Sequence, residues 1–299
     1  MTTLNSRAEA SASVSPLPGA NPSRSGLAAA LRRHWPEYAI EAALLGAFMV
    51  SACVFSVVLE HPGSPVRQSI ADGFARRALM GLAMGATAIA IIYSPWGRRS
   101  GAHINPATTL TFFRLGRVEG ADAVLYAAAQ FVGALAGIGL MAWLLPAAVR
   151  HPAVNFAATL PGPAGAGAAF AAEVAITFVL ITVVLAMTNA PRWNRLTGLA
   201  VGACVALFIT FEAPLSGMSM NPARTFGSAS GAMRWDHLWI YFTAPPLGML
   251  LAAEARLRTR GLHSILCAKL HHENDQRCIF RCGYPVCAPA LPAKGAHRG

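Results

Sequence analysis

The chain has 299 residues, of which 55% are hydrophobic and only 12% are charged, and its mean hydropathy is +0.46. Soluble domains are about one quarter charged, so this composition excludes an ordinary soluble protein and favours one that lies mostly in a lipid bilayer. Its 24 Lys and Arg residues outnumber its 13 Asp and Glu residues, but they stand between apolar runs and near the C-terminus. We therefore expect no nucleic-acid partner and interpret the basic residues as signals of membrane topology.

The chain divides into three regions by composition. Residues 1–36 are rich in Ser, Ala, Pro and Gly and lack the apolar core of a signal peptide, so we expect a disordered cytoplasmic segment. Residues 37–257 are expected to form the membrane domain, with halves at about 37–150 and 165–257. We expect residues 258–299 to form a cytoplasmic tail rich in Cys and His.

Six apolar runs are each close to the ~20 residues that a helix needs to cross ~30 Å of hydrocarbon. They cover residues 40–59, 78–96, 123–148, 166–188, 196–215 and 238–253. An even number of spans puts both termini on one side, and the excess of Arg next to that side predicts that both are cytoplasmic. We expect a multi-pass protein of a bacterial inner or plasma membrane. Small-xxx-small pairs predict close helix packing at Gly81/Gly85, Gly133/Gly137 and Gly198/Gly202.

The spans fall into two sets of three that repeat the same features. Glu41 and Glu173 stand near the start of the first and fourth spans. Each set then carries one Asn-Pro-Ala step, at 105–107 and 221–223, before its last span. Because three is an odd number, the second set must enter the membrane upside down relative to the first, which predicts an inverted repeat.

Each Asn-Pro-Ala step reads as the start of a helix, since Asn is a favoured N-cap and Pro is tolerated at the first helical position. The helices that begin at Asn105 and Asn221 can run to about Arg114 and Ser230, or ~15 Å, which is half a bilayer. Inverted topology brings their N-termini together at the midplane. The fold class we predict is therefore an all-α membrane protein of six transmembrane helices and two half-membrane helices.

Non-helical backbone at that depth is tolerated only where protein buries it or where it lines a watery cavity. The stretches SGAHI and SGMSM precede the two Asn residues and are expected to line a pore with carbonyl oxygens. Carbonyls are expected to face the pore at Gly101, Ala102, His103, Gly217 and Ser219. The facing helix N-termini place positive potential at the centre, which opposes cations and protons but not neutral molecules.

Intramembrane carboxylates are functional candidates by default, so Glu41 and Glu173 are consistent with a proton relay. The interpretation we favour is that each accepts hydrogen bonds from the irregular loop of its own half. His103 is expected to brace the first loop.

These motifs resemble the major intrinsic protein family, which comprises the aquaporins and aquaglyceroporins. The resemblance covers about residues 38–257 and includes SGAHINPAT, GMSMNPARTFG, the two Glu residues, and AQFVGALAG with Gln130. It implies a helical bundle with one pore in each protomer, a homotetramer, a role for Gln130 in supporting the first loop, and no enzymatic activity.

The resemblance also implies an outer selectivity constriction. Its residues correspond here to Met84, Ile209, Met218 and Arg224, with Gly85 as the alternative to Met84. The three apolar positions match neither the water-strict nor the glycerol-facilitating members. Thr225, Ala229 and the pair Tyr241-Phe242 are closer to the water channels. We expect a passive channel for water and possible small neutral solutes, with a wider glycerol or metalloid facilitator as the alternative.

The tail has no counterpart in the family pattern. Four Cys and three His lie within residues 263–287, and in a reducing cytosol such a cluster more often indicates a metal than a disulfide. The candidate ligands of a zinc-like ion are Cys267, His271, Cys278, Cys282 and Cys287. A redox switch, an unstructured tail, and a membrane platform for a sensing tail stay open. No cofactor is expected for transport, and a secondary transporter is disfavoured because matched half-helices at a neutral pore need no coupling ion.

Overall fold

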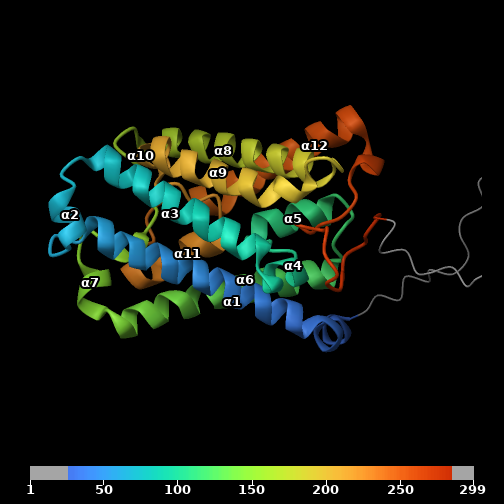
Figure 1. The fold of residues 1–299 in the computed structure, drawn as a ribbon, viewed down its shortest axis with the longest axis horizontal. Helices are drawn as coiled ribbons and strands as arrows, with labels where there is room; N and C mark the ends of the chain where they lie inside the picture. Colours follow the sequence, from blue (N-terminus) through green and yellow to red (C-terminus); the bar gives the residue numbers. More distant parts are fainter. Residues whose placement is uncertain (1–25, 285–299) are drawn as a thin grey trace, which may run out of the picture.

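A computed structural model describes residues 26–284, which fold into an all-helical membrane protein (Figure 1). Its long helices are α1 (Leu27–Glu60), α3 (Gly73–Tyr93), α6 (Gly120–Leu144), α8 (Gly165–Thr188), α9 (Thr197–Phe211) and α12 (Leu238–Arg260). Within the described residues, six helical segments are long and apolar enough to cross a membrane, as predicted. Large apolar side chains such as Leu82, Val132 and Trp143 are exposed on the outside of the bundle, where a bilayer would cover them.

Shorter helices connect and complete the bundle. The half-helices are α5 (Pro106–Arg114) and α11 (Pro222–Ala232). The connectors are α2 (Pro65–Ser69), α4 (Pro95–Ser100), α7 (Pro146–Arg150), α10 (Ala213–Ser216) and the 3-10 turns η1 (Asn155–Ala157), η2 (Asn194–Leu196) and η3 (Leu262–Ser264). Helix α1 starts at the same end of the bundle as the tail, which we call the terminal end (Figure 1). The opposite end, with α2 and α7, is the far end.

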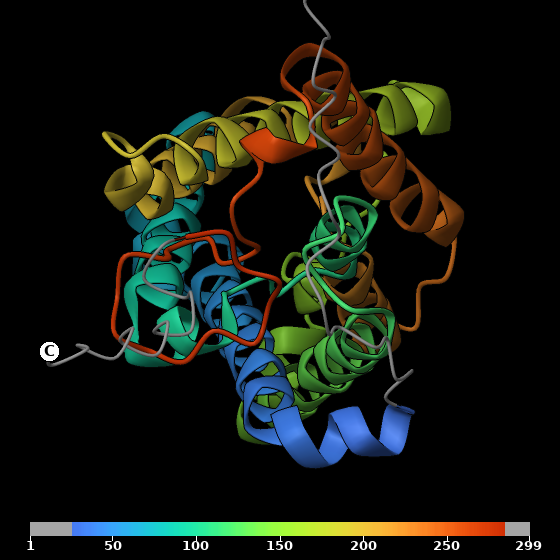
Figure 2. The same cartoon turned by 90° about the vertical axis from the view of Figure 1, so that its right-hand side faces the viewer.

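The expectation of a disordered segment is wrong for residues 27–36, because α1 begins at Leu27. Tyr38 donates a hydrogen bond to Asp122 Oδ1, and the His34 ring lies 2.8 Å from the same oxygen, so α6 fixes this part of the chain. Pro36 lies inside the helix and lacks the N–H that would continue the ladder, and the first turns of α1 lie across the rest of the helix (Figure 2). Residues 1–25 lie outside the described part of the chain.

Close approach of the helices depends on small residues, as the paired glycines predicted. The main pairings are α1 with α6, α3 with α9, and α8 with α12. A Cβ atom at Gly133 would lie 2.1 Å from the Ala42 carbonyl oxygen, and one at Gly85 would lie 2.5 Å from that of Gly202. These positions therefore admit only glycine without a shift of a helix backbone.

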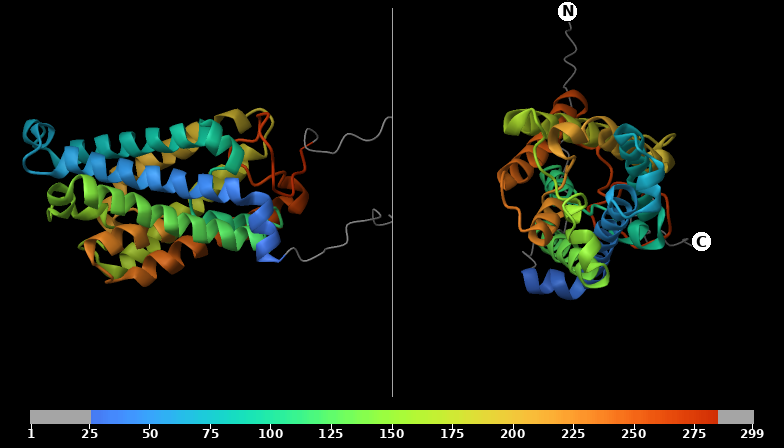
Figure 3. Two further views of the ribbon diagram at one scale, coloured as in Figure 1. Left: turned by 90° about the horizontal axis from the view of Figure 1, so that it is seen from below. Right: turned by 90° about the vertical axis from the view of Figure 1, so that its left-hand side faces the viewer.

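The two half-helices enter from opposite ends and meet inside the bundle, as the inverted repeat predicted. Helix α5 has nine residues and α11 has eleven, so each is about half as long as a spanning helix. Helix α5 lies toward the terminal end and α11 toward the far end (Figures 1 and 3), and the long helices surround both. This arrangement brings the two Asn-Pro-Ala steps together.

After α12 the chain turns back over the terminal end of the bundle (Figure 2). The helix continues to Arg260, so the tail begins at Gly261 rather than at residue 258. Ile265, Ala268 and Lys269 are at most 1% exposed, so the described tail is a packed element. It is not an unstructured extension.

Candidate functional site

The two Asn residues cap their own half-helices and also join the two halves. The Oδ1 atom of Asn105 accepts the Ala107 N–H at 2.9 Å, and that of Asn221 accepts the Ala223 N–H at 3.0 Å. The Asn105 Nδ2 group donates to the Met220 carbonyl, and the Asn221 Nδ2 group donates to the Ile104 carbonyl, both at 2.7 Å. Each amide has a second N–H hydrogen, which leaves a donor for a molecule in the pore.

The loops before these Asn residues adopt an unusual backbone. Ala102, Ile104, Met218 and Met220 have φ values between +40° and +55°, a region that non-glycine residues seldom occupy. Such strain of about 1–3 kcal/mol per residue persists only where the surroundings hold it in place. The repeat of the same conformation 116 residues apart, at 104 and 220 for example, shows that both halves form one kind of loop.

Two buried carboxylates, those of Glu41 and Glu173, hold the loops in place. This is the interpretation that we favoured over a proton relay. Glu41 accepts the N–H groups of His103 at 3.1 Å and Ile104 at 2.7 Å, and the Ser100 hydroxyl at 2.8 Å. Gln130 donates to the same carboxylate at 2.8 Å. Both oxygens of Glu41 therefore serve the backbone of the first loop and its neighbours.

Glu173 makes the equivalent contacts in the second half. It accepts the N–H groups of Ser219 at 2.6 Å and Met220 at 2.8 Å, and the Ser216 hydroxyl at 2.8 Å. Charge-assisted hydrogen bonds of this type are roughly twice as strong as neutral ones, which explains how the strained backbone is kept in place. His103 braces the first loop through Thr109 Oγ1 at 3.0 Å, as expected.

Two cavities meet at the half-helices. The outer cavity has a volume of about 380 Å³ and is bordered by Glu60 and Arg76, which lie at the far end of the bundle. The inner cavity has a volume of about 90 Å³ and contains Asn105 and Asn221 in its wall. Arg224, from the first turn of α11, borders both cavities and so stands at their junction.

The four residues assigned to the constriction border the same space. Met84, Ile209, Met218 and Arg224 all line the outer cavity. Gly85 instead packs against α9, which favours Met84 at this position. The Arg224 Nη1 atom is buried and has no hydrogen-bond partner among residues 26–284, so the guanidinium that lines both cavities is not fully paired within the protein. Of the expected carbonyl rows, Gly101, Ala102, His103, Gly217 and Ser219 all belong to the loops that border these cavities.

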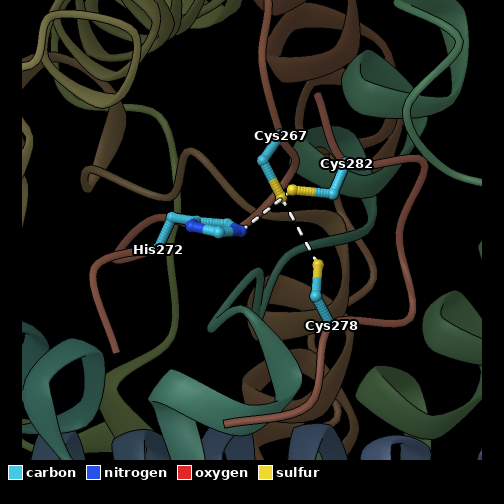
Figure 4. A group of neighbouring side chains, drawn as sticks. All are labelled: Cys267, His272, Cys278 and Cys282. Atoms are coloured by element: carbon cyan, nitrogen blue, oxygen red, sulfur yellow. Dashed lines mark hydrogen bonds between the residues drawn. The ribbon is translucent and has the colours of Figure 1, made fainter. Parts of the chain in front are cut away.

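The tail brings together a second group of functional side chains (Figure 4). The ligand atoms of Cys267, His272, Cys278 and Cys282 lie within 4.8 Å of one another and could hold a metal ion. The prediction of His271 as a ligand is corrected to His272. The His271 ring instead packs edge-on against Tyr93, with the ring centroids 5.0 Å apart. Adjacent side chains on a non-helical chain diverge, and sequence spacing alone did not separate the two imidazoles. Cys287 lies outside the described residues.

The thiols of this group lie close enough to form hydrogen bonds with one another, which changes their pKa values in opposite directions. Hydrogen bonds from Cys267 and Cys282 lower the pKa of Cys278 to about 3, while the hydrogen bond to Cys278 raises the pKa of Cys267. The Cys267 and Cys278 sulfurs are 3.5 Å apart, and Cys282 Sγ is 3.0 Å from His272 Nε2. Three sulfur atoms and an imidazole nitrogen therefore lie together, which is a set of ligand atoms suited to a soft cation.

Contacts between the tail and the pore were not predicted from sequence. Leu270 lines the inner cavity, and its backbone N–H donates to the Gly101 carbonyl at 3.1 Å. The Ala268 carbonyl lies 2.9 Å from His103 Nε2, and the Phe280 ring stacks on the His103 ring at 5.2 Å. The only signal in the sequence was the apolar character of residues such as Ile265, Leu266 and Leu270 between the Cys and His residues.

Six spans and two half-helices that meet at paired Asn-Pro-Ala steps define an inverted-repeat membrane channel. The model of the family described as "Major intrinsic protein" matches residues 41–255. The chain belongs to the major intrinsic protein family. It is accordingly a multi-pass integral membrane protein and a channel for water or small neutral solutes, not an enzyme.

The relatives of this chain include proteins named as glycerol facilitators and proteins named as aquaporins. It is 36% identical over 184 residues to "Glycerol uptake facilitator protein-like 6" of Lactiplantibacillus plantarum, with 58% of this chain and 81% of that one covered. It is 39% identical over 169 residues to "Aquaporin NIP3-1" of Oryza sativa, and 36% identical over 167 residues to "Aquaporin-4" of Bos taurus. These two alignments cover 56% and 55% of this chain and only 52% and 51% of the relatives, or about half their length.

The fold also resembles a solved structure. The aquaglyceroporin from Plasmodium falciparum superimposes with a TM-score of 0.58 at 18% identity, with 76% of this chain and 96% of that chain covered. At this level of identity the likeness supports the fold alone.

Proposed function

We propose that the protein is a passive channel whose main permeant is water, and that it excludes protons and ions. The observation that carries the proposal is the set of fixed donors along the two cavities, with Arg224 at their junction and Asn105 and Asn221 in the wall of the inner cavity. A molecule that passes must exchange its hydrogen bonds in bulk water for bonds to these donors and to the loop carbonyls. Water and small neutral solutes can do so without loss of a charge.

The same geometry opposes cations. The N-termini of α5 and α11 face each other and each carries a partial positive charge, and Arg224 adds a full one. In a narrow low-dielectric pore these charges raise the energy of a cation or a proton. The donors also fix the orientation of a central water molecule, which interrupts a proton-conducting chain.

A second candidate is a wider facilitator for glycerol or a metalloid acid. It is favoured by the three apolar side chains of the constriction, Met84, Ile209 and Met218, because flexible Met side chains adapt to larger solutes. The name of the Lactiplantibacillus relative agrees with this reading.

Stopped-flow light scattering on proteoliposomes tests both candidates. Osmotic shocks are given with an impermeant sugar, then with glycerol, urea and boric acid. Water permeability well above that of empty vesicles, with slow solute entry, supports the water channel. Fast glycerol or boric acid entry supports the second candidate, and uptake that saturates and follows a pH gradient would refute both.

Orientation and assembly are part of the proposal. The Arg bias supports placing the terminal end in the cytoplasm. Family membership and the exposed apolar outer surface support a homotetramer with one pore in each copy. Light scattering of the detergent-solubilised protein should give four chains per particle, and a monomer would contradict it.

A further inference from the structure

We propose that Cys267, His272, Cys278 and Cys282 bind one Zn²⁺ ion, and that this ion locks the tail across the terminal-end mouth of the pore. The closure of the pore by the tail, which we call the plug, rests on the proposed channel function. The metal site does not depend on that function. The metal-loaded protein is then the closed form, and loss of the ion lets the tail leave the mouth.

The geometry of the four side chains fits a tetrahedral ion. Zn²⁺ binds sulfur at about 2.3 Å and nitrogen at about 2.0–2.1 Å, so two sulfurs of a tetrahedral site are about 3.8 Å apart. The observed distances are 3.5 Å from Cys267 Sγ to Cys278 Sγ and 3.0 Å from Cys282 Sγ to His272 Nε2. All four ligand atoms lie within 4.8 Å of one another, so shifts of up to about 1 Å complete the site. Figure 4 shows the four side chains converging on one point.

The surrounding backbone suits thiolates. Each Cys sulfur accepts a hydrogen bond from the backbone N–H two residues further on, donated by Lys269, Phe280 and Tyr284 respectively. Three thiolates and one Zn²⁺ carry a net charge of −1. The Lys269 ammonium, 1% exposed and bonded to the carbonyls of Gln276 and Arg277, is a nearby cation that offsets it. Such outer contacts orient and stabilise metal ligands.

The same short segment closes the pore. Leu270 lies between the ligands Cys267 and His272 and lines the inner cavity, so the ion fixes both ends of the segment that carries the plug. The Leu270 backbone N–H donates a hydrogen bond to the Gly101 carbonyl, which is one of the acceptors expected to serve permeating molecules. An apolar side chain at a narrow mouth also expels water, which is a known way to close a pore.

The tail is anchored to the bundle at points outside the metal group. Arg195 of η2 forms two bonds of 2.5 and 2.6 Å with Glu273, and Leu266 N–H donates to Asn189 Oδ1 at 2.6 Å. These contacts keep the tail near the mouth. They lie at its rim, and hydrogen bonds such as Gly283 N–H to the Leu266 carbonyl at 2.6 Å already bring the two segments of the tail together. The ion would add direct bonds from residue 267 to residues 278 and 282.

The metal site is tested by elemental analysis of reduced, tag-free, full-length protein. We expect about one Zn²⁺ per chain, lost in the double variant Cys278→Ala, Cys282→Ala. Replacement by Co²⁺ should give the intense thiolate-to-cobalt absorption of a tetrahedral site in the wild type but not in the double variant. His271→Ala and Cys204→Ala are matched controls, since each removes a neighbouring imidazole or a thiol outside the group. Equal metal content in the wild type and the double variant would overturn the site.

The plug is tested by water permeability per chain in proteoliposomes. Leu270→Ala should keep the ion yet conduct about fivefold or more faster, as removal of an apolar closure predicts. The double variant and a chain stopped after Arg260 should conduct equally fast. If the water permeability of Leu270→Ala, of the double variant and of the shortened chain equals that of the wild type, the plug is refuted. If no form exceeds empty vesicles, the proposed function and the plug both fail, while the metal content still decides the site.

Discussion

At the scale of single residues, the buried polar groups of the pore have two different roles. Glu41 and Glu173 are fully buried, but their oxygens are spent on loop N–H groups and on nearby side chains. Arg224 keeps one nitrogen unpaired among the described residues at the junction of the cavities. The residues that hold the loops therefore differ from the residue that faces the permeating molecule.

Arg224→Val should raise glycerol and urea entry on the order of tenfold, the factor that a barrier lower by about 1.4 kcal/mol produces. The variant removes a charge and widens the constriction, whereas Asn105 and Asn221 still order the centre. Water flow should change less than solute entry. Arg234→Val is the control, because Arg234 is exposed and pairs with Asp236. Unchanged solute entry and proton exclusion in Arg224→Val would show that Arg224 does not line the pore.

Glu212 follows α9 and should make stability depend on pH. Burial raises the pKa of its carboxyl to about 7 from 4.5, and the charge of Glu173 acts in the same direction. Between these pH values the folded protein holds a proton that the unfolded chain has released, so the free energy of unfolding falls as pH rises through about 7. Below 4.5 both states are protonated and this loss is absent.

Glu212→Gln should remove most of that loss. Thermal unfolding in detergent at pH 5, 6, 7 and 8 should show a Tm that falls less for the variant than for the wild type. Glu254→Gln, at a side chain 36% exposed on α12, is the control and should follow the wild type. Identical curves for all three proteins would mean that Glu212 ionises normally.

At the scale of elements, glycines decide how closely the helices approach. Helix α6 offers a matched pair, because a Cβ at Gly133 would collide with the backbone of α1 and a Cβ at Gly139 would meet nothing within 4 Å. The same substitution on one helix therefore has opposite expected effects.

Gly133→Ala should destabilise the bundle by about 1–3 kcal/mol, the typical cost of overpacking a core. Gly139→Ala should be neutral or stabilising by up to about 1 kcal/mol, because alanine is the better helix former. Thermal unfolding of the two variants in one detergent measures the difference. A Gly133→Ala protein as stable as Gly139→Ala would place α1 further from α6 than described.

At the scale of the whole molecule, the channel and the tail are separable parts. All six spans and both half-helices lie before Gly261. The described part of the tail packs on the terminal end of the bundle, mostly at loops and helix ends such as Gly101, Asn189 and Arg195.

A chain stopped after Arg260 should therefore insert and fold, with the same number of chains per particle as the full-length protein. Membrane helix packing is settled within the bundle, where no span is lost. Light scattering and thermal unfolding of the two purified proteins make the comparison. Aggregation of the shortened chain, or loss of its cooperative unfolding, would show that the tail is part of the folding unit.

The sequence by itself determined the membrane class, the six spans and the inverted repeat. Apolar length reports the bilayer directly, and Asn-Pro-Ala specifies a capped helix start through local chemistry alone. The half-helices end at Arg114 and Ala232, close to the positions expected from the pattern. The paired Glu residues were interpretable because each repeats at the same place in its half.

Only the tertiary structure decided which imidazole joins the thiols, and where the tail lies. His271 and His272 are neighbours in the chain, and their environments differ because Tyr93 of α3 takes one ring and Cys282 the other. The contact of Leu270 with the pore joins residues 270 and 101, which no local pattern relates. Such a pairing depends on the packed shape of the bundle, and a single sequence carries no signal of it.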